Sequence, residues 1–322
     1  MNVLVTGAAG FIGSAYVRTL LGPGAGVARV TVLDKLTYAG TLANLDLGDP
    51  RLTFVRGDIC DADLVGKLVA EADQVVHFAA ESHVDRSIAA ADEFVRTNVM
   101  GTQTLLDAAL RHGVDRFVHV STDEVYGSVE EGSRDEADPL DPNSPYAASK
   151  AASDLIALSY HRTHGLDVLV TRCSNNYGPR QFPEKVIPLF ITNLLDGETV
   201  PLYGDGLNIR DWLHVEDHCA ALELVRRNGR PGEIYNISGG NELSNRDLTG
   251  FLLSACGGDW SRVVAVPDRK GHDRRYSVRG EKIATELGYR PRHDFERGLA
   301  DTVAWYRQNR DWWEPLKQRV GG

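Results

Sequence analysis

Two kinds of apolar pattern take turns along the first half of the chain. Short runs rich in β-branched residues are apolar on both sides, which is typical of parallel strands covered by helices on both faces. They predict strands over Asn2–Val5, Val30–Leu33, Thr53–Arg56, Gln74–Phe78, Arg116–Val120 and Val168–Thr171. Helical spacing between them predicts helices over Phe11–Leu21, Asp61–Ala72, Ala91–His112 and Tyr146–His164. Strands and helices in alternation predict an α/β fold with a doubly wound parallel Rossmann sheet.

The pattern becomes irregular after about residue 175, where four prolines (Pro179, Pro183, Pro188 and Pro201) divide the chain into short pieces. A helix over His214–Asn228 and a strand over Ile234–Ile237 are expected to return to the main sheet. We therefore expect a dinucleotide-binding domain made of residues 1–174 and about 211–238. Residues 175–210 and 239–322 are expected to form a smaller α/β domain that binds the substrate.

Composition narrows the possible partners. A net charge of −10 leaves no basic surplus for a nucleic acid. The four cysteines show no paired spacing, which is typical of a reducing compartment. No apolar run approaches the roughly 18 residues that a membrane span needs, and the first residues resemble a strand rather than a signal peptide. We expect a cytoplasmic protein with neither a nucleic-acid nor a membrane partner.

A glycine turn lies between the first expected strand and the first expected helix. In the segment Thr6–Gly13, Gly7 permits a tight turn, Gly10 lets backbone amides approach a pyrophosphate, and Gly13 lets the helix pack close to the sheet. Such a pattern alone can be simple loop chemistry, but strand before and helix after is the context that dinucleotide binding requires. Ala8 replaces a glycine that is frequent in such turns, at little cost if its φ is negative.

An acidic residue, Asp34, ends the second expected strand, about 20 residues after the last glycine. A carboxylate there accepts hydrogen bonds from ribose hydroxyls and repels a 2′-phosphate, so it predicts NAD rather than NADP. The neighbouring Lys35 leaves NADP as an alternative. Asp58 and Ile59, after the third strand, are expected near the adenine or in a simple strand-end turn.

Polar residues follow the fifth expected strand, where ligands of open α/β sheets bind. They are Thr122, Asp123 and Glu124. Downstream, Tyr146 and Lys150 have the i, i+4 spacing that places two side chains on one helical face. A lysine ammonium stabilises a phenolate and is expected to lower the pKa of the tyrosine. This pair by itself is common in helices, so the interpretation depends on the glycine turn as well.

Several longer segments carry a resemblance to a known family. They are residues 79–87, 121–127, 172–179, 182–188, 203–206 and 210–212. In these segments and over its whole length the chain resembles the extended short-chain dehydrogenase/reductases, and within them the dTDP-glucose 4,6-dehydratases of deoxysugar pathways that feed antibiotics. The resemblance implies an NAD-dependent lyase acting on dTDP-glucose. It also implies a homodimer in which the two long helices form a four-helix bundle.

The resemblance implies a role for each catalytic residue. Tyr146 takes the proton of the sugar C4 hydroxyl, Thr122 binds that oxygen, and Lys150 holds the nicotinamide ribose. Glu124 removes the C5 proton and Asp123 protonates the leaving C6 hydroxyl, giving dTDP-4-keto-6-deoxyglucose and water. Related sugar epimerases usually have small or apolar residues in place of the two acids. A 4-epimerase, a decarboxylase and a non-catalytic NAD-binding regulator remain the alternatives.

The resemblance also implies the ligand contacts. For the cofactor these are Gly7, Gly10, Phe11, Ile12, Gly13, Asp34, Lys35, Thr37, Asp58, Ile59, Ala79, Ala80, Ser82, Thr97, Tyr146, Lys150 and Asn176. For the nucleotide sugar they are Ser82, Thr122, Asn175, Lys185, Val186, Pro201, Tyr203, Arg210, Asn245, Arg269 and His272, with Tyr203 stacked on the base. The choice between dTDP and UDP stays open. Arg180 departs from the family, which commonly has an aromatic residue there.

Histidine pairs raise the question of a metal site. His161 with His164 and His214 with His218 have spacings that could bind a metal ion. Because no cysteine or carboxylate cluster nearby completes either pair, we expect no metal.

Overall fold

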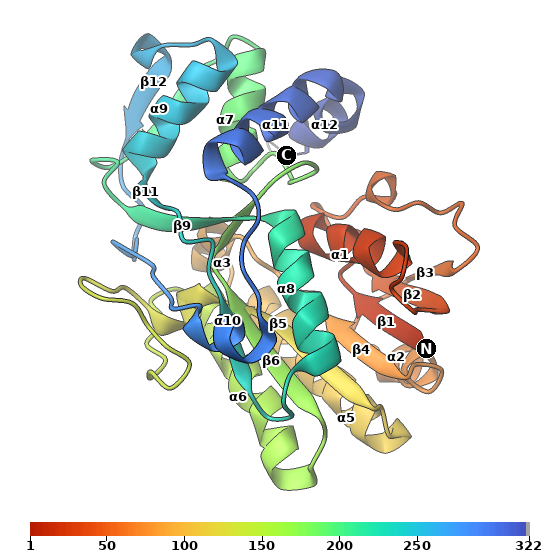
Figure 1. Cartoon of the computed structure of the whole chain (residues 1–322). Coiled ribbons are helices and arrows are strands. Elements are labelled where there is room, and N and C mark those ends of the chain that lie inside the picture. The colour runs from red at the N-terminus through yellow and green to blue at the C-terminus, as the bar shows by residue number, and fades with distance from the viewer. Residues whose placement is uncertain (320–322) are drawn as a thin grey trace.

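A seven-stranded parallel sheet forms the centre of the computed structural model, which describes residues 1–319 (Figure 1). Its strands, in the order β10-β6-β5-β4-β1-β2-β3, are β1 (Asn2–Thr6), β2 (Arg29–Asp34), β3 (Leu52–Arg56), β4 (Gln74–His77), β5 (Arg116–Thr122), β6 (Val168–Cys173) and β10 (Ile234–Ile237). The chain leaves β1 for β2 on one side and later continues at β4 on the other. This reversal beside β1 is the topological switch point at which doubly wound sheets bind ligands.

Helices cover both faces of this sheet. One hydrophobic core lies under α1 (Phe11–Leu21), α8 (Val215–Asn228) and α10 (Glu281–Leu287). The other lies under α2 (Ala62–Val69), α5 (Thr102–His112) and α6 (Pro145–His164). Because the sheet is buried on both sides, its strands are almost continuously apolar. The shorter connecting helices are η1 (Leu42–Asn44), α3 (Val84–Ala89), α4 (Asp92–Phe94), η2 (Val95–Gly101) and η3 (Asp123–Tyr126).

A second, smaller part stands above the carboxyl ends of these strands (Figure 1). It has a three-stranded sheet, β11-β9-β7, and a two-stranded sheet, β12-β8. A third core fills it, lined by aromatic residues such as Trp313, Tyr306 and Phe190. Its elements are β7 (Asn175–Tyr177), α7 (Val186–Leu195), β8 (Val200–Tyr203), β9 (Ile209–His214), β11 (Glu242–Ser244), α9 (Asn245–Cys256), η4 (Trp260–Arg262), β12 (Val263–Val266), α11 (Phe295–Gln308) and α12 (Arg310–Lys317).

The predicted elements of the first half are confirmed, with shifts of a few residues at their ends. The expected strand over Ile234–Ile237 does return to the main sheet, beside β6. Two details were wrong. The expected helix over Ala91–His112 consists of α4, the π-helical η2 and α5 in succession. Neither Pro188 nor Pro201 breaks the chain: Pro188 lies in the first turn of α7, where the missing amide hydrogen costs nothing, and Pro201 lies within strand β8. The domain boundaries proposed above stay a prediction.

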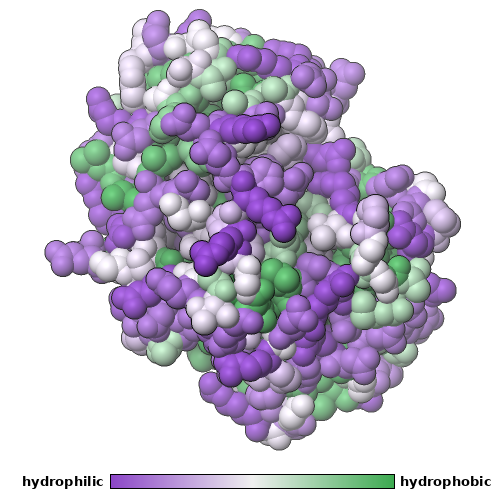
Figure 2. Space-filling view, in the orientation of Figure 1, coloured by the Kyte–Doolittle hydropathy of each residue, from purple (hydrophilic) through white to green (hydrophobic). Residues whose placement is uncertain are grey.

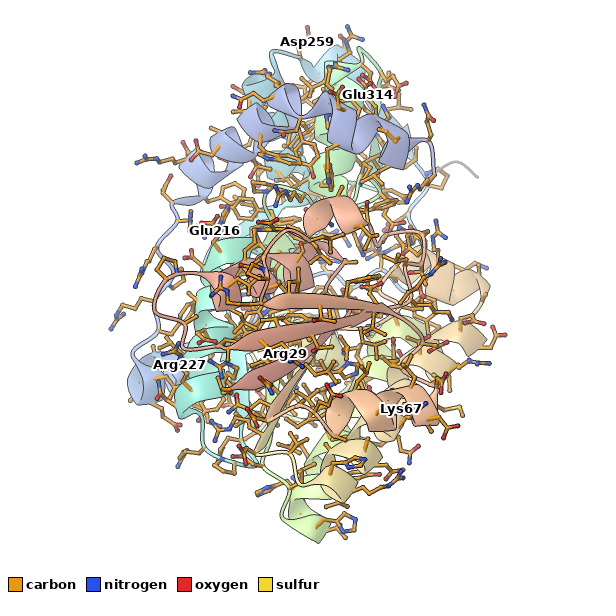
Figure 3. The ribbon with its side chains drawn as sticks, turned by 90° about the vertical axis from the view of Figure 1, so that its right-hand side faces the viewer. Arg29, Lys67, Glu216, Arg227, Asp259 and Glu314 are labelled. Carbon is orange, nitrogen blue, oxygen red and sulfur yellow. The ribbon has the colours of Figure 1, made fainter. Side chains whose placement is uncertain are left out.

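Charged side chains cover the surface of both parts. Figure 2 shows a mostly hydrophilic face on which apolar residues form small scattered groups. All six residues labelled in Figure 3 are exposed, with Asp259 and Glu314 on the upper part and Arg29 and Lys67 on the lower. Among residues 1–319, no helix is long and apolar enough to cross a membrane.

Candidate active site

A cavity of about 320 Å³ lies at the carboxyl edge of the large sheet, between the two parts of the molecule. It is lined by the glycine turn, the end of β2, the segments after β4 and β5, the first turns of α6, and residues 173–185. All seventeen residues predicted to bind the cofactor line this cavity, and so do the five predicted catalytic residues. The fold therefore brings together side chains that lie far apart in the sequence.

The glycine turn leaves no space for larger residues. Gly7 has a φ of +70°, and a Cβ there would lie 2.5 Å from the backbone nitrogen of Ala79, just after β4. A Cβ on Gly13 would lie 2.7 Å from the carbonyl oxygen of Gly7. Gly10 is the N-cap of α1, and no side chain caps this helix end. Its first amides are therefore available to a ligand, and the helix dipole favours an anion there.

The two departures from the family pattern, Ala8 in the glycine turn and Arg180 further along the chain, differ in backbone conformation. Among residues 1–319 the non-glycine residues with positive φ are Leu36 and Arg180. Ala8 is therefore accommodated without strain, as the sequence predicted on condition of a negative φ. Arg180 has a φ of 69°, an unusual conformation for a residue with a side chain.

The end of β2 is fastened to the glycine turn. Asp34 accepts hydrogen bonds from the backbone amides of Ala9 (2.9 Å) and Leu36 (2.8 Å). Burial raises the pKa of Asp34, and these two hydrogen bonds act in the opposite direction. Lys35, the residue that left NADP as an alternative, pairs with Asp58 at 2.9 Å. Because its ammonium is already paired, it is less suited to a 2′-phosphate, and the geometry favours NAD.

The strand β5 ends in a turn that redirects two neighbouring carboxyl groups. Thr122 closes the strand and accepts a hydrogen bond from the amide of Glu124 (3.2 Å), which starts the single turn η3 at Asp123. On an extended strand the two acids would point to opposite sides. Because the chain turns here, Thr122, Asp123 and Glu124 all line the same cavity.

Asp123 and Glu124 have different electrostatic surroundings. Burial raises the pKa of Asp123 well above its usual value, and the carboxylates of Glu124 and Asp211 raise it further. One of its oxygens, Oδ2, is buried without a hydrogen-bond partner. Burial also raises the pKa of Glu124, but three cations (Arg269, Arg210 and Lys185) oppose that shift, whereas Arg210 is the cation that opposes the shift of Asp123. Asp123 is therefore suited to hold a proton as an acid and Glu124 to act as a base.

Tyr146 and Lys150 lie on one face of α6, as predicted, and both are buried. The Lys150 ammonium donates a 2.8 Å hydrogen bond to the carbonyl oxygen of Val120. Burial lowers the pKa of Lys150 to about 8. The sequence led us to expect that Lys150 lowers the pKa of Tyr146, but this pKa is not lowered in the protein without cofactor. Burial and the Glu124 carboxylate raise the pKa of Tyr146, and the Thr122 hydroxyl only partly offsets them.

A group of basic residues reaches the cavity from the smaller part. Lys185 lines it and donates a 2.8 Å hydrogen bond to the carbonyl oxygen of Ser82 on the opposite wall. Arg210 is buried on β9, and its guanidinium lies 4.2 Å above the Tyr276 ring. Arg269, like these two, is close enough to lower the pKa of Glu124. An acidic protein thus gathers cations where an anionic ligand would need them.

The predicted substrate contacts fall into two groups. Ser82, Thr122, Asn175 and Lys185 line the cavity. Those outside its lining are Val186 on α7, Pro201 and Tyr203 on β8, Arg210 on β9, Asn245 on α9, and Arg269 and His272 after β12. Of these last two, His272 is 2.6 Å from the Asp268 carboxylate. These outer residues belong to the smaller part, and their roles stay predictions.

Two residues of the site had no role in the sequence interpretation. Glu184 lines the cavity and accepts a 2.9 Å hydrogen bond from the Tyr38 hydroxyl. The Tyr276 hydroxyl lies 3.5 Å from Glu124 and donates a 2.6 Å hydrogen bond to Asp273. Glu184 is next in sequence to Lys185, a predicted substrate contact, and this position could have indicated that Glu184 belongs to the site. Tyr276 lies in a loop without periodicity, so no local pattern pointed to it.

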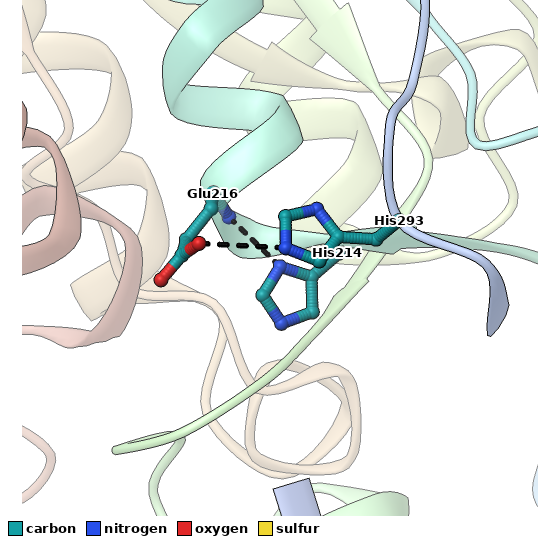
Figure 4. A group of neighbouring side chains, drawn as sticks. All are labelled: His214, Glu216 and His293. Atoms are coloured by element: carbon teal, nitrogen blue, oxygen red, sulfur yellow. Dashed lines mark hydrogen bonds and ion pairs between the residues drawn. The ribbon is translucent and has the colours of Figure 1, made fainter. Parts of the chain in front are cut away.

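A separate histidine group lies away from this cavity. The side chains of His214, Glu216 and His293 approach within 4.8 Å of one another (Figure 4). The rings of His214 and His293 stack, with centroids 3.9 Å apart and planes inclined by 23°. A metal ion must lie in the plane of each imidazole that binds it, and stacked rings direct their nitrogen lone pairs side by side rather than to one point. The arrangement favours a stacked pair beside a carboxylate.

The proteins to which this chain is similar agree with the geometry of the site. A family model described as GDP-mannose 4,6 dehydratase matches residues 4–302. A dTDP-glucose 4,6-dehydratase of Streptomyces antibioticus is 70% identical to the chain, covering 100% of it and 97% of the relative. The low-salt glycan biosynthesis protein Agl12 of Haloferax volcanii is 54% identical, over 95% of this chain and 98% of that protein.

Solved structures agree with this assignment. The dTDP-glucose 4,6-dehydratase DesIV of Streptomyces venezuelae, solved with NAD and TYD bound, superposes with a TM-score of 0.97 at 64% identity, covering 98% of this chain and all of the other. A UDP-glucose 4-epimerase of Thermotoga maritima superposes with a TM-score of 0.89 at 32% identity, over 96% of this chain and 99% of the other. The chain therefore belongs to the nucleotide-sugar 4,6-dehydratase family of the extended short-chain dehydrogenase/reductases, together with proteins named dTDP-glucose 4,6-dehydratase.

Proposed function

We propose that this protein is an NAD-dependent dTDP-glucose 4,6-dehydratase, a lyase that converts dTDP-glucose into dTDP-4-keto-6-deoxyglucose and water. The observation that carries the proposal is the pair Asp123 and Glu124, which face one cavity together with Tyr146. An epimerase only moves a hydride and needs no such pair of acids. The identity to relatives named for this activity supports the same conclusion.

The cavity fits the cofactor in three respects. Gly7 and Gly13 lie so close to neighbouring backbone that a Cβ would clash, so the turn requires the glycines of a dinucleotide-binding turn. The uncapped start of α1 suits a diphosphate, and Asp34 at the end of β2 suits the ribose hydroxyls. When bound, NAD supplies the hydride acceptor for C4 and the hydride that later reduces C6, and it brings the positive charge of the nicotinamide to the site.

For the oxidation, Tyr146 is the base that takes the proton from the C4 hydroxyl. Its raised pKa in the chain alone means that a nearby positive charge is needed to hold it as phenolate at neutral pH. Thr122, next to it at the end of β5, holds the C4 oxygen by a hydrogen bond. Lys150 holds the nicotinamide ribose, for which its place one helical turn after Tyr146 is suited.

For the elimination, Glu124 takes the C5 proton, which the C4 ketone makes acidic. Asp123 gives its proton to the C6 hydroxyl as this group leaves as water; after product release Asp123 takes a proton from solvent and Tyr146 gives up the C4 hydroxyl proton to solvent, which restores the starting state. The different pKa shifts of the two carboxyl groups support this division, because the acid must start protonated and the base ionised. Glu124 then returns its proton to C5 as C6 is reduced. Asp123 is buried and Glu124 is partly buried, which suits a step that must exclude bulk water from the unsaturated sugar.

The basic residues hold the diphosphate of the substrate. Lys185, Arg210 and Arg269 all act on the pKa of Glu124, so a phosphate bound among them lies close to the reacting sugar. Tyr203, partly exposed on β8, is placed to stack on the thymine. We assign residues 1–174 and about 211–238 to cofactor binding and the remainder to the nucleotide sugar.

We infer that the protein acts in the cytoplasm as a homodimer. Four of its exposed large hydrophobic residues lie on the two long helical stretches: Val95, Met100, Leu110 and Leu155. The stretches η2–α5 and α6 pack against each other. Pairing them with the same helices of a second copy would form a four-helix bundle and cover these side chains.

Incubation with dTDP-glucose tests the activity. The expected product is a 4-keto-6-deoxy sugar, identified by its absorbance in alkali and by mass spectrometry as substrate minus water. Formation of dTDP-galactose instead would contradict the proposal and support a 4-epimerase. Parallel reactions with UDP-glucose and GDP-mannose test the nucleotide, and faster turnover of either would shift the assigned substrate.

A further inference from the structure

A chain of buried polar groups runs behind the catalytic cavity and joins α6 to η3. Asp154 lies one helical turn after Lys150 on α6, and its side chain is completely buried. Its Oδ2 accepts a 2.8 Å hydrogen bond from Nε of Arg172 on β6. Nη1 of Arg172 donates a 2.7 Å hydrogen bond to the hydroxyl of Tyr126, the last residue of η3. The helix and the turn are thus connected through one arginine.

The charges in this network of buried side chains balance. His119 Nε2 lies 3.3 Å from the other Asp154 oxygen, but burial lowers the pKa of His119 to about 4, so this histidine is neutral at neutral pH. Arg172 is therefore the cation that balances Asp154, and the side chains are 2% and 0% exposed. The guanidinium also lies 4.7 Å from the centre of the Tyr126 ring. An ion pair without water holds its geometry tightly, because separating it would leave an unpaired buried charge.

The end of this network at Tyr126 is fixed as well. The Tyr126 hydroxyl accepts from Arg172 and donates a 3.0 Å hydrogen bond to Oδ1 of Asn236 on β10. Both the donor and the acceptor functions of this hydroxyl are thus used, which defines one position for the ring. Its neighbours in η3 are the two catalytic acids. A movement of Tyr126 would therefore move the acids.

We propose that Asp154, Arg172 and Tyr126 form a positioning strut that holds η3, with its two acids, in register with the face of α6 that carries the catalytic tyrosine and lysine. The inference rests on the proposed function, in which α6 serves the oxidation and η3 the elimination. Both steps act on adjacent carbons of one sugar, so the two groups must keep a fixed separation. None of the three strut residues lines the cavity, and they act through the catalytic residues.

The substitution Tyr126→Phe tests the strut, since it removes one hydroxyl and leaves the ring. We expect kcat to fall about tenfold to hundredfold, the effect of a displacement of about 1 Å, with KM changed less than threefold. The loss should fall on elimination. In a single turnover, reduced nicotinamide should accumulate by absorbance, and the isotope effect of C5-deuterated substrate should rise relative to wild type. Asp154→Asn, which keeps the side-chain volume, should show the same signature.

Tyr16→Phe is the matched control. Tyr16 is also buried, and its hydroxyl donates a 2.9 Å hydrogen bond to Glu223, which pairs with Arg226. This second cluster of tyrosine, carboxylate and arginine does not line the cavity. Tyr16→Phe should lower the melting temperature by a similar amount but leave the accumulation of reduced nicotinamide and the isotope effects as in wild type.

The outcomes separate the strut from the proposed function. If the wild-type enzyme dehydrates dTDP-glucose but Tyr126→Phe and Asp154→Asn change only the melting temperature, the strut is wrong and the network is merely structural. If the wild-type enzyme does not dehydrate dTDP-glucose, the proposed function fails and the strut fails with it. Should Tyr126→Phe not fold, Asp154→Asn decides by the same two readouts.

Discussion

The carboxylate of Asp34 accepts a 2.9 Å hydrogen bond from the backbone amide of Ala9, so the end of β2 and the glycine turn hold each other in place. A single side chain thus shapes the cofactor pocket and presents a negative charge to it. Asp34→Asn removes the charge and keeps an acceptor. We expect NAD to bind about tenfold to hundredfold more weakly and the preference for NAD over NADP to narrow.

Quenching of tryptophan fluorescence on titration with each cofactor measures both affinities. Asp46→Asn is the control, because this exposed aspartate lies outside the cofactor cavity. Equal weakening of NAD and NADP by Asp34→Asn would contradict a role in selectivity and leave only the contact with Ala9.

Replacing the two acids should separate elimination from oxidation. In Glu124→Gln the base for C5 is lost, and in Asp123→Asn the acid for C6 is lost, while Tyr146 and Lys150 remain. We expect kcat to fall about a hundredfold to ten-thousandfold in each. Glu124→Gln should also stop exchange of the C5 hydrogen with solvent deuterium, whereas Asp123→Asn should retain it. Mass spectrometry of recovered sugar checks this, and exchange retained in Glu124→Gln would show that another group is the base.

Tyr146→Phe should abolish the first step altogether. Without the phenol no group takes the C4 hydroxyl proton, and turnover should fall at least about a hundredfold. NAD binding should stay within a few-fold of wild type, because the ring still fills its place on α6. Turnover is measured from product, and the cofactor content of the purified protein serves as the control. Unchanged turnover would contradict the assignment of Tyr146 as the base of the first step.

Acid should destabilise the protein through its buried histidines. Burial lowers the pKa of His218 to about 3 and that of His119 to about 4, whereas an unfolded histidine titrates near 6.5. Between these values the unfolded chain binds protons that the folded chain does not, so stability is lost as the pH falls from about 6.5 to about 4. Each histidine contributes up to about 1.4 kcal/mol per pH unit.

Urea unfolding between about pH 7 and about pH 4 measures this slope. His218→Gln should reduce it by about one proton, since burial is the cause of the shift at His218. His164→Gln, at the C-terminal end of α6 and exposed, should not change it. A slope that is the same in both variants and in wild type would contradict the assignment.

A charge on the exposed face of α6 should dissociate the inferred dimer. Leu155 is 56% exposed, and Leu155→Glu would place a carboxylate inside a four-helix bundle. Sedimentation velocity should show a dimer for wild type and a monomer for the variant. Leu47→Glu, at an equally exposed leucine in the loop before β3, should remain a dimer. A wild-type monomer would contradict the bundle.

Much of the larger part of the fold could be predicted because its signals are local. Parallel strands buried on both faces are mostly apolar, so β1, β2, β4, β5 and β6 stand out in the sequence. The glycine turn and Asp34 were recognisable because their spacing is set by one strand–turn–helix unit. The strands of the smaller part, three to six residues long, carry no such period. β9 pairs in parallel with β7 and antiparallel with β11, an arrangement that no local pattern specifies.

The residue types of the active site were therefore readable from the sequence and the resemblance implied their roles, but the electrostatic surroundings of each residue were not readable. Proximity in the chain suggested that Asp123 and Glu124 act together. The resemblance implied that Asp123 is the acid and Glu124 the base, and the tertiary structure adds a physical reason, because a pKa depends on burial and on charges brought from distant segments. Arg210 and Arg269 arrive from the smaller part, and Asp211 comes with them. For the same reason the raised pKa of Tyr146, the role of Tyr276 and the strut behind η3 appeared only once the chain was folded.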